Sequence, residues 1–176
     1  MTGTIHVRPD LTSSVAAVRT LFDAAACSCA LVDADGETLR FAASDGAGAE
    51  GIIGVEMPVS RGIAGWAVIS GQPIAVRDVG TDARFARDVA EATSYLPTTI
   101  LAAPMFDHEG ETLGVLSVLD PRIDQASDWV LAVLGTLASQ VALLVASGPR
   151  ADEPRLEELG RRVLELTLGY REGDLG

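Results

Sequence analysis

The 176-residue chain contains no lysine and no asparagine, so all 13 of its cationic side chains are arginines. Without a lysine ammonium group, Schiff-base catalysis, a P-loop phosphate site and a kinase-type Lys–Glu pair are excluded. The 25 acidic residues leave a net charge of −12, and such a surface repels nucleic-acid phosphates. The composition therefore predicts no nucleic-acid partner.

Cysteine and histidine are scarce as well, with two residues of each type. Cys27 and Cys29 are too close in sequence for an unstrained disulfide and form no CxxC pair, which argues against a secreted, disulfide-stapled framework. His6 and His108 are the only imidazoles, so we expect neither a metal site nor a Ser–His–Asp triad. The N-terminus lacks the pattern of a signal peptide, and we expect a cytoplasmic protein.

The longest hydrophobic run, residues 129–147, contains no charged side chain. Its length approaches the roughly 20 residues of a membrane-spanning helix. Gly135, Thr136, Ser139 and Gln140 lie at its centre, however, and no arginine cluster marks either end. We therefore expect a helix buried in a core or a subunit interface in preference to a membrane span.

Apolar periodicity and turn residues predict the order of the elements. Because hairpins pair antiparallel, this order predicts an α+β fold with one antiparallel sheet, the terminal helices covering one face and the middle helices the other. The expected elements are a helix (12–26), a hairpin turning at 34–36, a strand (52–59), a short helix from Gly62 to a left-handed cap at Gly71, a strand (74–76), a helix (78–95), a second hairpin (98–106 and 111–119) and the uncharged helix (127–147).

Several motifs in the middle of the chain occur in a fixed order: Gly62/Gly65, Gly71/Pro73, Asp78, Asp82/Arg84/Phe85, Pro104 and Gly114–Leu116. This combination resembles the GAF domain family over about residues 12–147. The resemblance implies a GAF-like central antiparallel sheet of six strands with helices on both faces. It also implies dimerisation through the first and last helices, which is common in the family.

The resemblance divides the chain into three parts. Residues 1–11 are expected to form a flexible N-terminus, 12–147 the GAF-like domain, and 148–176 a linker and a C-terminal helix. Within the last part, residues 155–170 carry a narrow apolar stripe: Leu156, Leu159, Val163 and Leu166. Docking of this helix on its own domain and docking on a protein partner both remain open.

The family places a ligand pocket between the sheet and the middle helices. Apolar walls with a few hydroxyls suit a small organic or anionic ligand, and Arg84, Arg87 and the N-terminus of the 82–95 helix are candidates to neutralise an anion. Alternatively, the aromatic side chains fill the core and the arginines are solvated. A cyclic nucleotide is not expected, because the family's Asn-Lys signature for it is missing. The candidate ligand-binding residues are Trp66, Arg84, Phe85, Tyr95, Thr98 and Thr99.

We therefore expect a cytoplasmic sensory or regulatory module that binds a small molecule or anion and signals through homodimer or partner contacts. An alternative is a thiol-dependent redox enzyme resembling free methionine-R-sulfoxide reductase and using Cys27 or Cys29. Both thiols lie at the start of the first strand, and the structural interpretation is that they are small buried hydrophobic residues. A third alternative is a purely structural dimerisation module. The sequence identifies no cofactor and no catalytic residue.

Overall fold

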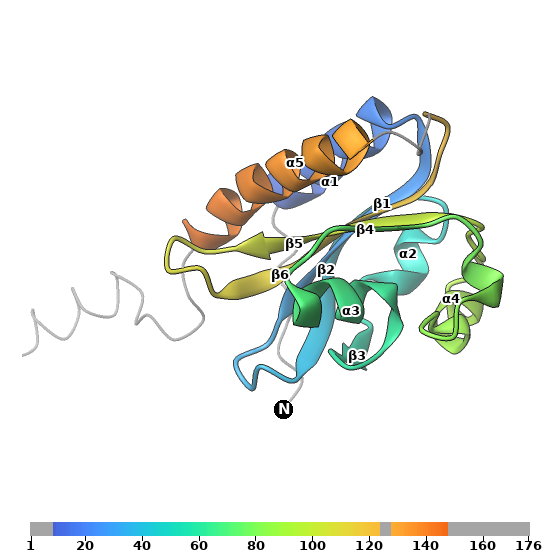
Figure 1. Cartoon of the computed structure of the whole chain (residues 1–176), viewed down its shortest axis with the longest axis horizontal. Helices are drawn as coiled ribbons and strands as arrows, with labels where there is room; N and C mark the ends of the chain where they lie inside the picture. The colour runs from blue at the N-terminus through green and yellow to red at the C-terminus, as the bar shows by residue number, and fades with distance from the viewer. Residues whose placement is uncertain (1–8, 124–127, 148–176) are drawn as a thin grey trace, which may run out of the picture. The chain divides into compact units, whose positions relative to one another are not determined.

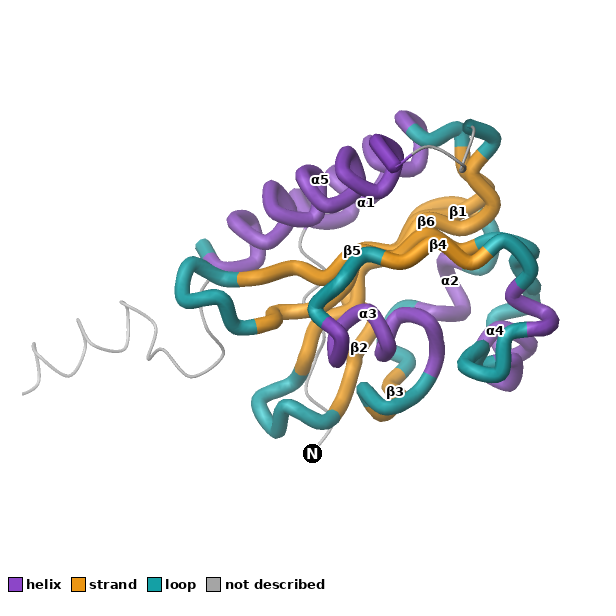
Figure 2. The backbone as a smooth tube through the Cα atoms, viewed as in Figure 1, coloured by secondary structure: helices purple, strands orange, loops and turns teal. Residues whose placement is uncertain are grey.

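The computed structural model describes residues 9–123 and 128–147, which build one six-stranded sheet with helices on both of its faces (Figures 1 and 2). Neighbouring strands all pair antiparallel, in the order β3-β2-β1-β6-β5-β4. The predicted α+β architecture is confirmed. The elements are α1 (Pro9–Leu21), β1 (Ala24–Val32), β2 (Thr38–Gly46), α2 (Ala49–Ile52), β3 (Glu56–Pro58), α3 (Gly62–Ser70), β4 (Ile74–Val76), the 3₁₀ turn η1 (Val79–Thr81), α4 (Arg87–Ala92), β5 (Ile100–Phe106), β6 (Thr112–Pro121) and α5 (Asp128–Ala146).

The two terminal helices, α1 and α5, cover one face of the sheet and close an apolar core there (Figure 1). Leu116 of β6, Leu134 of α5 and Phe22 after α1 are buried in this core. In the described part of the chain, α5 is the one helix that is long and apolar enough to cross a membrane by length and composition. The buried positions along one side of α5 show that this side packs in the core, as expected from the sequence.

The middle helices lie on the opposite face of the sheet (Figure 2), where Leu39, Ile63 and Val115 form a second apolar cluster. Helix α3 ends at Gly71, whose φ of 63° is left-handed and whose N–H donates to the Ala67 carbonyl at 3.0 Å. The predicted cap at Gly71 is therefore confirmed. At Gly65, an added Cβ would lie 2.2 Å from the Val59 carbonyl oxygen, so only glycine lets α3 pack this closely.

The predicted helix over 78–95 is wrong, because the chain forms only η1 and the six-residue α4 there. The side chain of Asp82 accepts a hydrogen bond from the Arg84 backbone N–H at 2.9 Å. Such a local turn competes with helical hydrogen bonding. Asp82 therefore holds residues 82–85 in a loop, and the helix begins only at Arg87.

Other boundaries differ from the prediction as well. Of the predicted strand 52–59, only Glu56–Pro58 is extended, since Ile52 belongs to α2. Helix α1 begins at Pro9, within the segment 1–11 that was expected to be flexible. Strand β6 continues to Pro121, although Asp120 within it has a positive φ of 49°. The predicted 155–170 helix lies outside the described residues.

Candidate ligand-binding site

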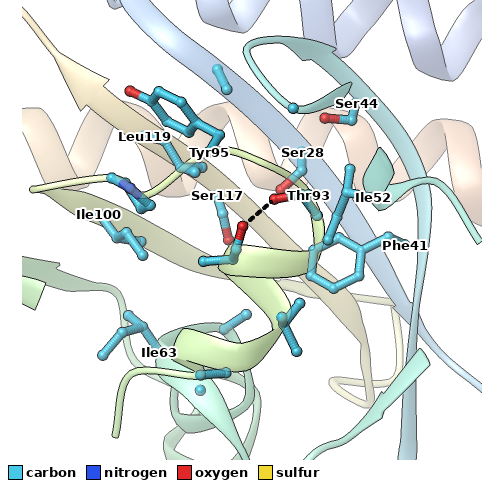
Figure 3. Close-up of a pocket in the computed structure, with 18 of the residues that line it drawn as sticks. Ser28, Phe41, Ser44, Ile52, Ile63, Thr93, Tyr95, Ile100, Ser117 and Leu119 are labelled. Atoms are coloured by element: carbon cyan, nitrogen blue, oxygen red, sulfur yellow. Dashed lines mark hydrogen bonds between the residues drawn. The ribbon is translucent and has the colours of Figure 1, made fainter. Parts of the chain in front are cut away.

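A cavity of about 100 Å³ lies between the sheet and the α2–α4 side of the domain (Figure 3). Strands β1, β2 and β6 supply its floor, and α3, α4 and the chain after α4 supply its other walls. Most of the lining is apolar. The residues labelled in Figure 3 are Ser28, Phe41, Ser44, Ile52, Ile63, Thr93, Tyr95, Ile100, Ser117 and Leu119.

Three serines, one from each of three adjacent strands, form a row across the floor of the cavity. Ser28 of β1 lies opposite Ser44 of β2 in one strand pair and opposite Ser117 of β6 in the other. Side chains at directly opposite positions of antiparallel strands share a face, with Cβ atoms roughly 5 Å apart. The three residues retain only 6%, 7% and 6% of their accessible surface. We call Ser44, Ser28 and Ser117 the serine row.

The hydroxyls at the cavity differ in their hydrogen bonds. Ser44 Oγ donates to the Cys27 carbonyl at 3.2 Å, and Thr93 Oγ1 donates to the Ala90 carbonyl at 2.8 Å (Figure 3). Among the residues that the structure describes, the Ser28 and Ser117 hydroxyls have no hydrogen-bond partner. They are therefore the two hydroxyls left available for a bound molecule.

Residues 77–97, which we call the lid segment, connect β4 to the last hairpin and contribute Phe85, Val89 and Tyr95 to the cavity wall. Asp120 of β6 holds the end of this segment. Its carboxylate accepts hydrogen bonds from the Tyr95 hydroxyl and from the Thr98 and Thr99 backbone N–H groups, the last two at 2.9 and 2.8 Å. Burial and the bond to Asp120 raise the pKa of Tyr95, so this phenol stays protonated as a donor.

A second contact holds the lid segment at α4. Arg61, which precedes α3, forms an ion pair with Asp88 of α4 at 2.7 Å. The hydrogen bond from Arg61 lowers the pKa of Asp88. Both side chains are largely exposed, so this pair contributes less than the three hydrogen bonds of the partly buried Asp120.

Of the six candidate ligand-binding residues, only Phe85 and Tyr95 line the cavity. Trp66 and Arg84 lie at a neighbouring hollow on the outer side of α3, which shares Gly62, Phe85 and Ala86 with the cavity lining. There the Arg84 guanidinium sits 5.1 Å from the centre of the Trp66 ring. Thr98 is exposed, and Thr99 Oγ1 donates to the Arg77 carbonyl at 3.1 Å. The structure thus places four of the six outside the cavity wall, whereas ligand contact itself stays a prediction.

The two arginines expected to neutralise an anion lie outside the cavity wall, and anion binding itself stays a prediction. Arg84 pairs with Asp82 at 2.6 Å, and its hydrogen bond lowers the pKa of Asp82 to about 2. The Arg87 guanidinium donates to the Gly80 carbonyl at 3.4 Å. Neither arginine lines the cavity. The expected 82–95 helix N-terminus is absent as well, because α4 starts at Arg87 and has no side-chain cap.

The two thiols lie on the other face of the sheet, in the core beneath α1 and α5. Both side chains are fully buried. Burial raises the pKa of Cys27 and raises the pKa of Cys29 to about 12. Both are therefore neutral thiols at physiological pH, without the thiolate that redox chemistry requires. In the described ranges, no three side chains of the metal-binding types come together.

Sequence reasoning missed the serine row, although a signal for it was present. If Cys27 and Cys29 face the core, strand alternation places Ser28 on the opposite face. Ser117 sits in the same way between buried apolar neighbours of β6. What the sequence lacked was the pairing register of β1 with β6, which brings two serines 89 positions apart to the same level of the sheet.

The sequence and the fold were compared with known proteins. A family model described as GAF domain matches residues 11–145. No curated protein matches the sequence. Two similar solved structures are GAF domains of phosphoenolpyruvate-protein phosphotransferases. The one from Acinetobacter has 22% identity and a TM-score of 0.65, covering 77% of this chain and 79% of that chain. The one from Coxiella burnetii has 19% identity and a TM-score of 0.66, covering 81% and 86%.

A third similar structure is an enzyme, free methionine-R-sulfoxide reductase from Neisseria meningitidis in complex with its substrate. It shares 24% identity with this chain, with a TM-score of 0.62 and coverage of 76% of this chain and 74% of that chain. At these identities the three structures establish a shared fold and carry no information on shared chemistry.

Proposed function

The chain belongs to the GAF domain family, and we propose that it is a regulatory module of that family that binds a small molecule in the cavity beside the serine row. The family is commonly sensory or regulatory. The observation that carries the proposal is a cavity with apolar walls and two unpartnered hydroxyls on its floor, Ser28 and Ser117. Apolar walls with a few polar groups are typical of ligand sites.

The position of the cavity supports a way for ligand binding to affect the terminal helices α1 and α5. A bound molecule would touch the sheet floor and the lid segment together. Strand β6 carries Ser117 on the cavity face and Leu116 and Val118 in the core beneath α1 and α5. A change in packing at the cavity therefore reaches the terminal helices through one strand.

We further propose a cytoplasmic homodimer that forms through α1 and α5. A groove between these helices is lined by residues without formal charge, and Leu21 at its edge is 60% exposed. In a chain of net charge −12, an uncharged face is the part of the surface where two copies meet with the least repulsion. Signalling to another protein, including through residues 155–170, remains part of this proposal. The residues lining the groove are Ser14, Ala17, Val18, Leu21, Leu137, Gln140, Val141 and Leu144.

The alternative function, a thiol-dependent reductase that uses Cys27 or Cys29, is less well supported. Cys27 and Cys29 are on the sheet face opposite the cavity, fully buried and protonated. A reductase of this kind needs a thiolate that its substrate can reach.

Native mass spectrometry of the purified protein tests ligand binding. We expect a retained small molecule, or a rise in thermal midpoint with a member of a metabolite panel. The variant Ala90→Leu places a larger side chain at the cavity wall of α4 and should abolish either effect. The matched control is Ala132→Leu on the exposed side of α5, which should leave both unchanged. Equal binding by the two variants would place the ligand elsewhere.

Sedimentation velocity tests the homodimer. We expect a dimer for the parent chain and a shift towards monomer for Leu21→Glu, which puts a charge at the edge of the α1/α5 groove. Ile69→Glu is the control, because Ile69 is 65% exposed on α3, away from the groove. A monomeric parent chain would refute the dimer without affecting the ligand proposal.

A further inference from the structure

The chemistry of the cavity lining narrows the class of molecule that the site accepts. Serine offers one donor and two acceptor lone pairs, so Ser28 and Ser117 together can bind a hydroxyl or a carbonyl oxygen. Both residues are more than nine-tenths buried, and both line the cavity (Figure 3). Folding has therefore placed two hydroxyls at the cavity without a protein partner, where they can exchange hydrogen bonds with a ligand oxygen.

The other polar side chains at the cavity are already engaged. Ser44 donates to the Cys27 carbonyl, Thr93 donates to the Ala90 carbonyl, and the Tyr95 hydroxyl donates to Asp120. Each of these bonds uses the one O–H donor of the hydroxyl, so the side-chain donors still available to a ligand are Ser28 and Ser117. The remaining lining offers apolar surface to the rest of the molecule.

No charged side chain lines the cavity within the described residues. The nearby ions are paired outside it, Arg61 with Asp88 and Arg84 with Asp82. A carboxylate, phosphate or ammonium group that entered would lose its hydration and find no counterion, and the cost of burying an unpaired charge far exceeds that of burying a neutral group. The lining therefore disfavours ionised ligands of either sign.

The size of the cavity sets a second limit. Its volume of about 100 Å³ is below the roughly 150 Å³ of an apolar cavity that holds benzene. The enclosed space therefore suits a molecule with a body of about one small ring.

We infer that the site selects an uncharged molecule of about one small ring, with an apolar body and a hydroxyl or carbonyl oxygen that hydrogen-bonds to Ser28 and Ser117. This inference rests on the proposed function, because it concerns the same cavity. It replaces the wider expectation of a small organic or anionic ligand with a neutral one.

Four probes of similar shape test the inference: benzyl alcohol, toluene, benzoate and benzylamine. Each is titrated into the ¹⁵N-labelled full chain at neutral pH while backbone amide shifts are followed by NMR. We expect benzyl alcohol to shift amides of β1, β6 and the lid segment. The dissociation constant should be several-fold weaker for toluene, which lacks the oxygen, and at least tenfold weaker for benzoate and benzylamine, which carry a charge.

The double variant Ser28→Ala/Ser117→Ala tests the role of the serine row. We expect its affinity for benzyl alcohol to fall to that for toluene, while its affinity for toluene is unchanged or higher. The ratio of the two affinities is measured on one folded sample, so a loss of stability cannot imitate the result. Ser139→Ala is the control, because the Ser139 hydroxyl is exposed on α5 and bonds to the Gly135 carbonyl of the same helix.

Three results would overturn the inference: benzoate or benzylamine binding as tightly as benzyl alcohol, a double variant that keeps its preference for benzyl alcohol, or no response to any probe. Retention of a charged compound in the cavity of the purified protein would refute the neutral class and leave the proposed function standing. If nothing is retained, no metabolite raises the thermal midpoint and no probe moves the cavity amides, the proposed function fails too.

Discussion

The two faces of the sheet are built from the same strands and have opposite character. Beneath α1 and α5, Cys27, Cys29 and Leu116 are fully buried in a closed apolar core. On the other face, the alternating residues Ser28 and Ser117 line a cavity, and no hydrogen bond of their hydroxyls is found among the described residues. The apolar face is closely packed, whereas the side chains on the cavity face leave an unfilled space and two hydroxyls without hydrogen bonds. The closed core and the cavity are thus lined by residues that are neighbours in sequence.

The largest expected difference between the faces concerns packing. Leu116→Ala should lower the free energy of unfolding by about 2–5 kcal/mol, because it opens a void in a closed core. Ile52→Ala at the cavity wall should cost about 1–2 kcal/mol, because Ile52 is only half-buried and already borders empty space. Urea unfolding measures both values. Equal losses would mean that the two faces are equally well packed.

The next largest effect concerns how the lid segment is held. Asp120→Asn keeps a residue type that tolerates the positive φ at this position. It removes the charge that strengthens three hydrogen bonds, so we expect a loss of about 1–2 kcal/mol. Amide hydrogen exchange should speed up in residues 87–99 and remain slow in β1 and β6.

Asp107→Asn is a matched control for the lid experiment. Asp107 accepts backbone hydrogen bonds from Glu109 and Glu111 in the turn between β5 and β6, at 2.8 and 2.9 Å. Its substitution should affect that turn and leave exchange in the lid segment unchanged. Faster exchange throughout the sheet for Asp120→Asn would show that Asp120 supports the whole domain and not the lid segment in particular.

A smaller effect separates the members of the serine row. Ser44→Ala should lower the free energy of unfolding by about 0.5–1.5 kcal/mol, because it removes the hydrogen bond to Cys27. Ser28→Ala and Ser117→Ala should leave the unliganded protein unchanged or more stable by up to about 1 kcal/mol, because their hydroxyls have no bond to lose. Thermal unfolding of the three variants without ligand decides this. Equal destabilisation by all three would indicate that Ser28 and Ser117 are bonded in solution.

The smallest expected effect arises on the apolar face at alkaline pH. Thiols of the unfolded chain ionise near pH 9, whereas burial raises the pKa of Cys29 to about 12 in the folded state. The stabilisation that comes from keeping the thiols neutral is complete below pH 9 and is lost as the pH rises towards 12. At pH 9 the loss should be under about 1 kcal/mol.

The double variant Cys27→Ala/Cys29→Ala provides the control for this pH dependence. Its free energy of unfolding should decline less than that of the parent chain between pH 8 and pH 10. The parent thiols should also react with iodoacetamide at pH 8 only after unfolding. An identical alkaline decline in both proteins, or rapid alkylation of the folded chain, would show that the thiols are accessible.

The sequence predicted those parts of the fold that depend on local signals. Gly71 and Pro73 marked the end of α3, and two turn-forming segments marked the hairpins of β1–β2 and β5–β6. The 78–95 helix was wrong because Asp82 supports either a helix cap or a local turn, and the residue type does not distinguish them. Of the candidate ligand-binding residues, Phe85 and Tyr95 line the cavity, and their contact with a ligand stays a prediction. Trp66 and Arg84 lie outside its wall, because they stack on each other at the outer side of α3.

The sequence by itself excluded chemistry that requires lysine and predicted the antiparallel α+β fold. It also predicted that Cys27 and Cys29 lie on the same face of a strand. These follow from residue types and from spacings of a few positions. Only the tertiary structure decided that Ser28 and Ser117 meet at one cavity, that the arginines are paired outside it, and that Asp120 holds the lid segment. The meeting of Ser28 with Ser117 depends on the register between strands far apart in the chain, which is set by the packing of the whole sheet, and the other two depend on how the loops and short helices pack against it.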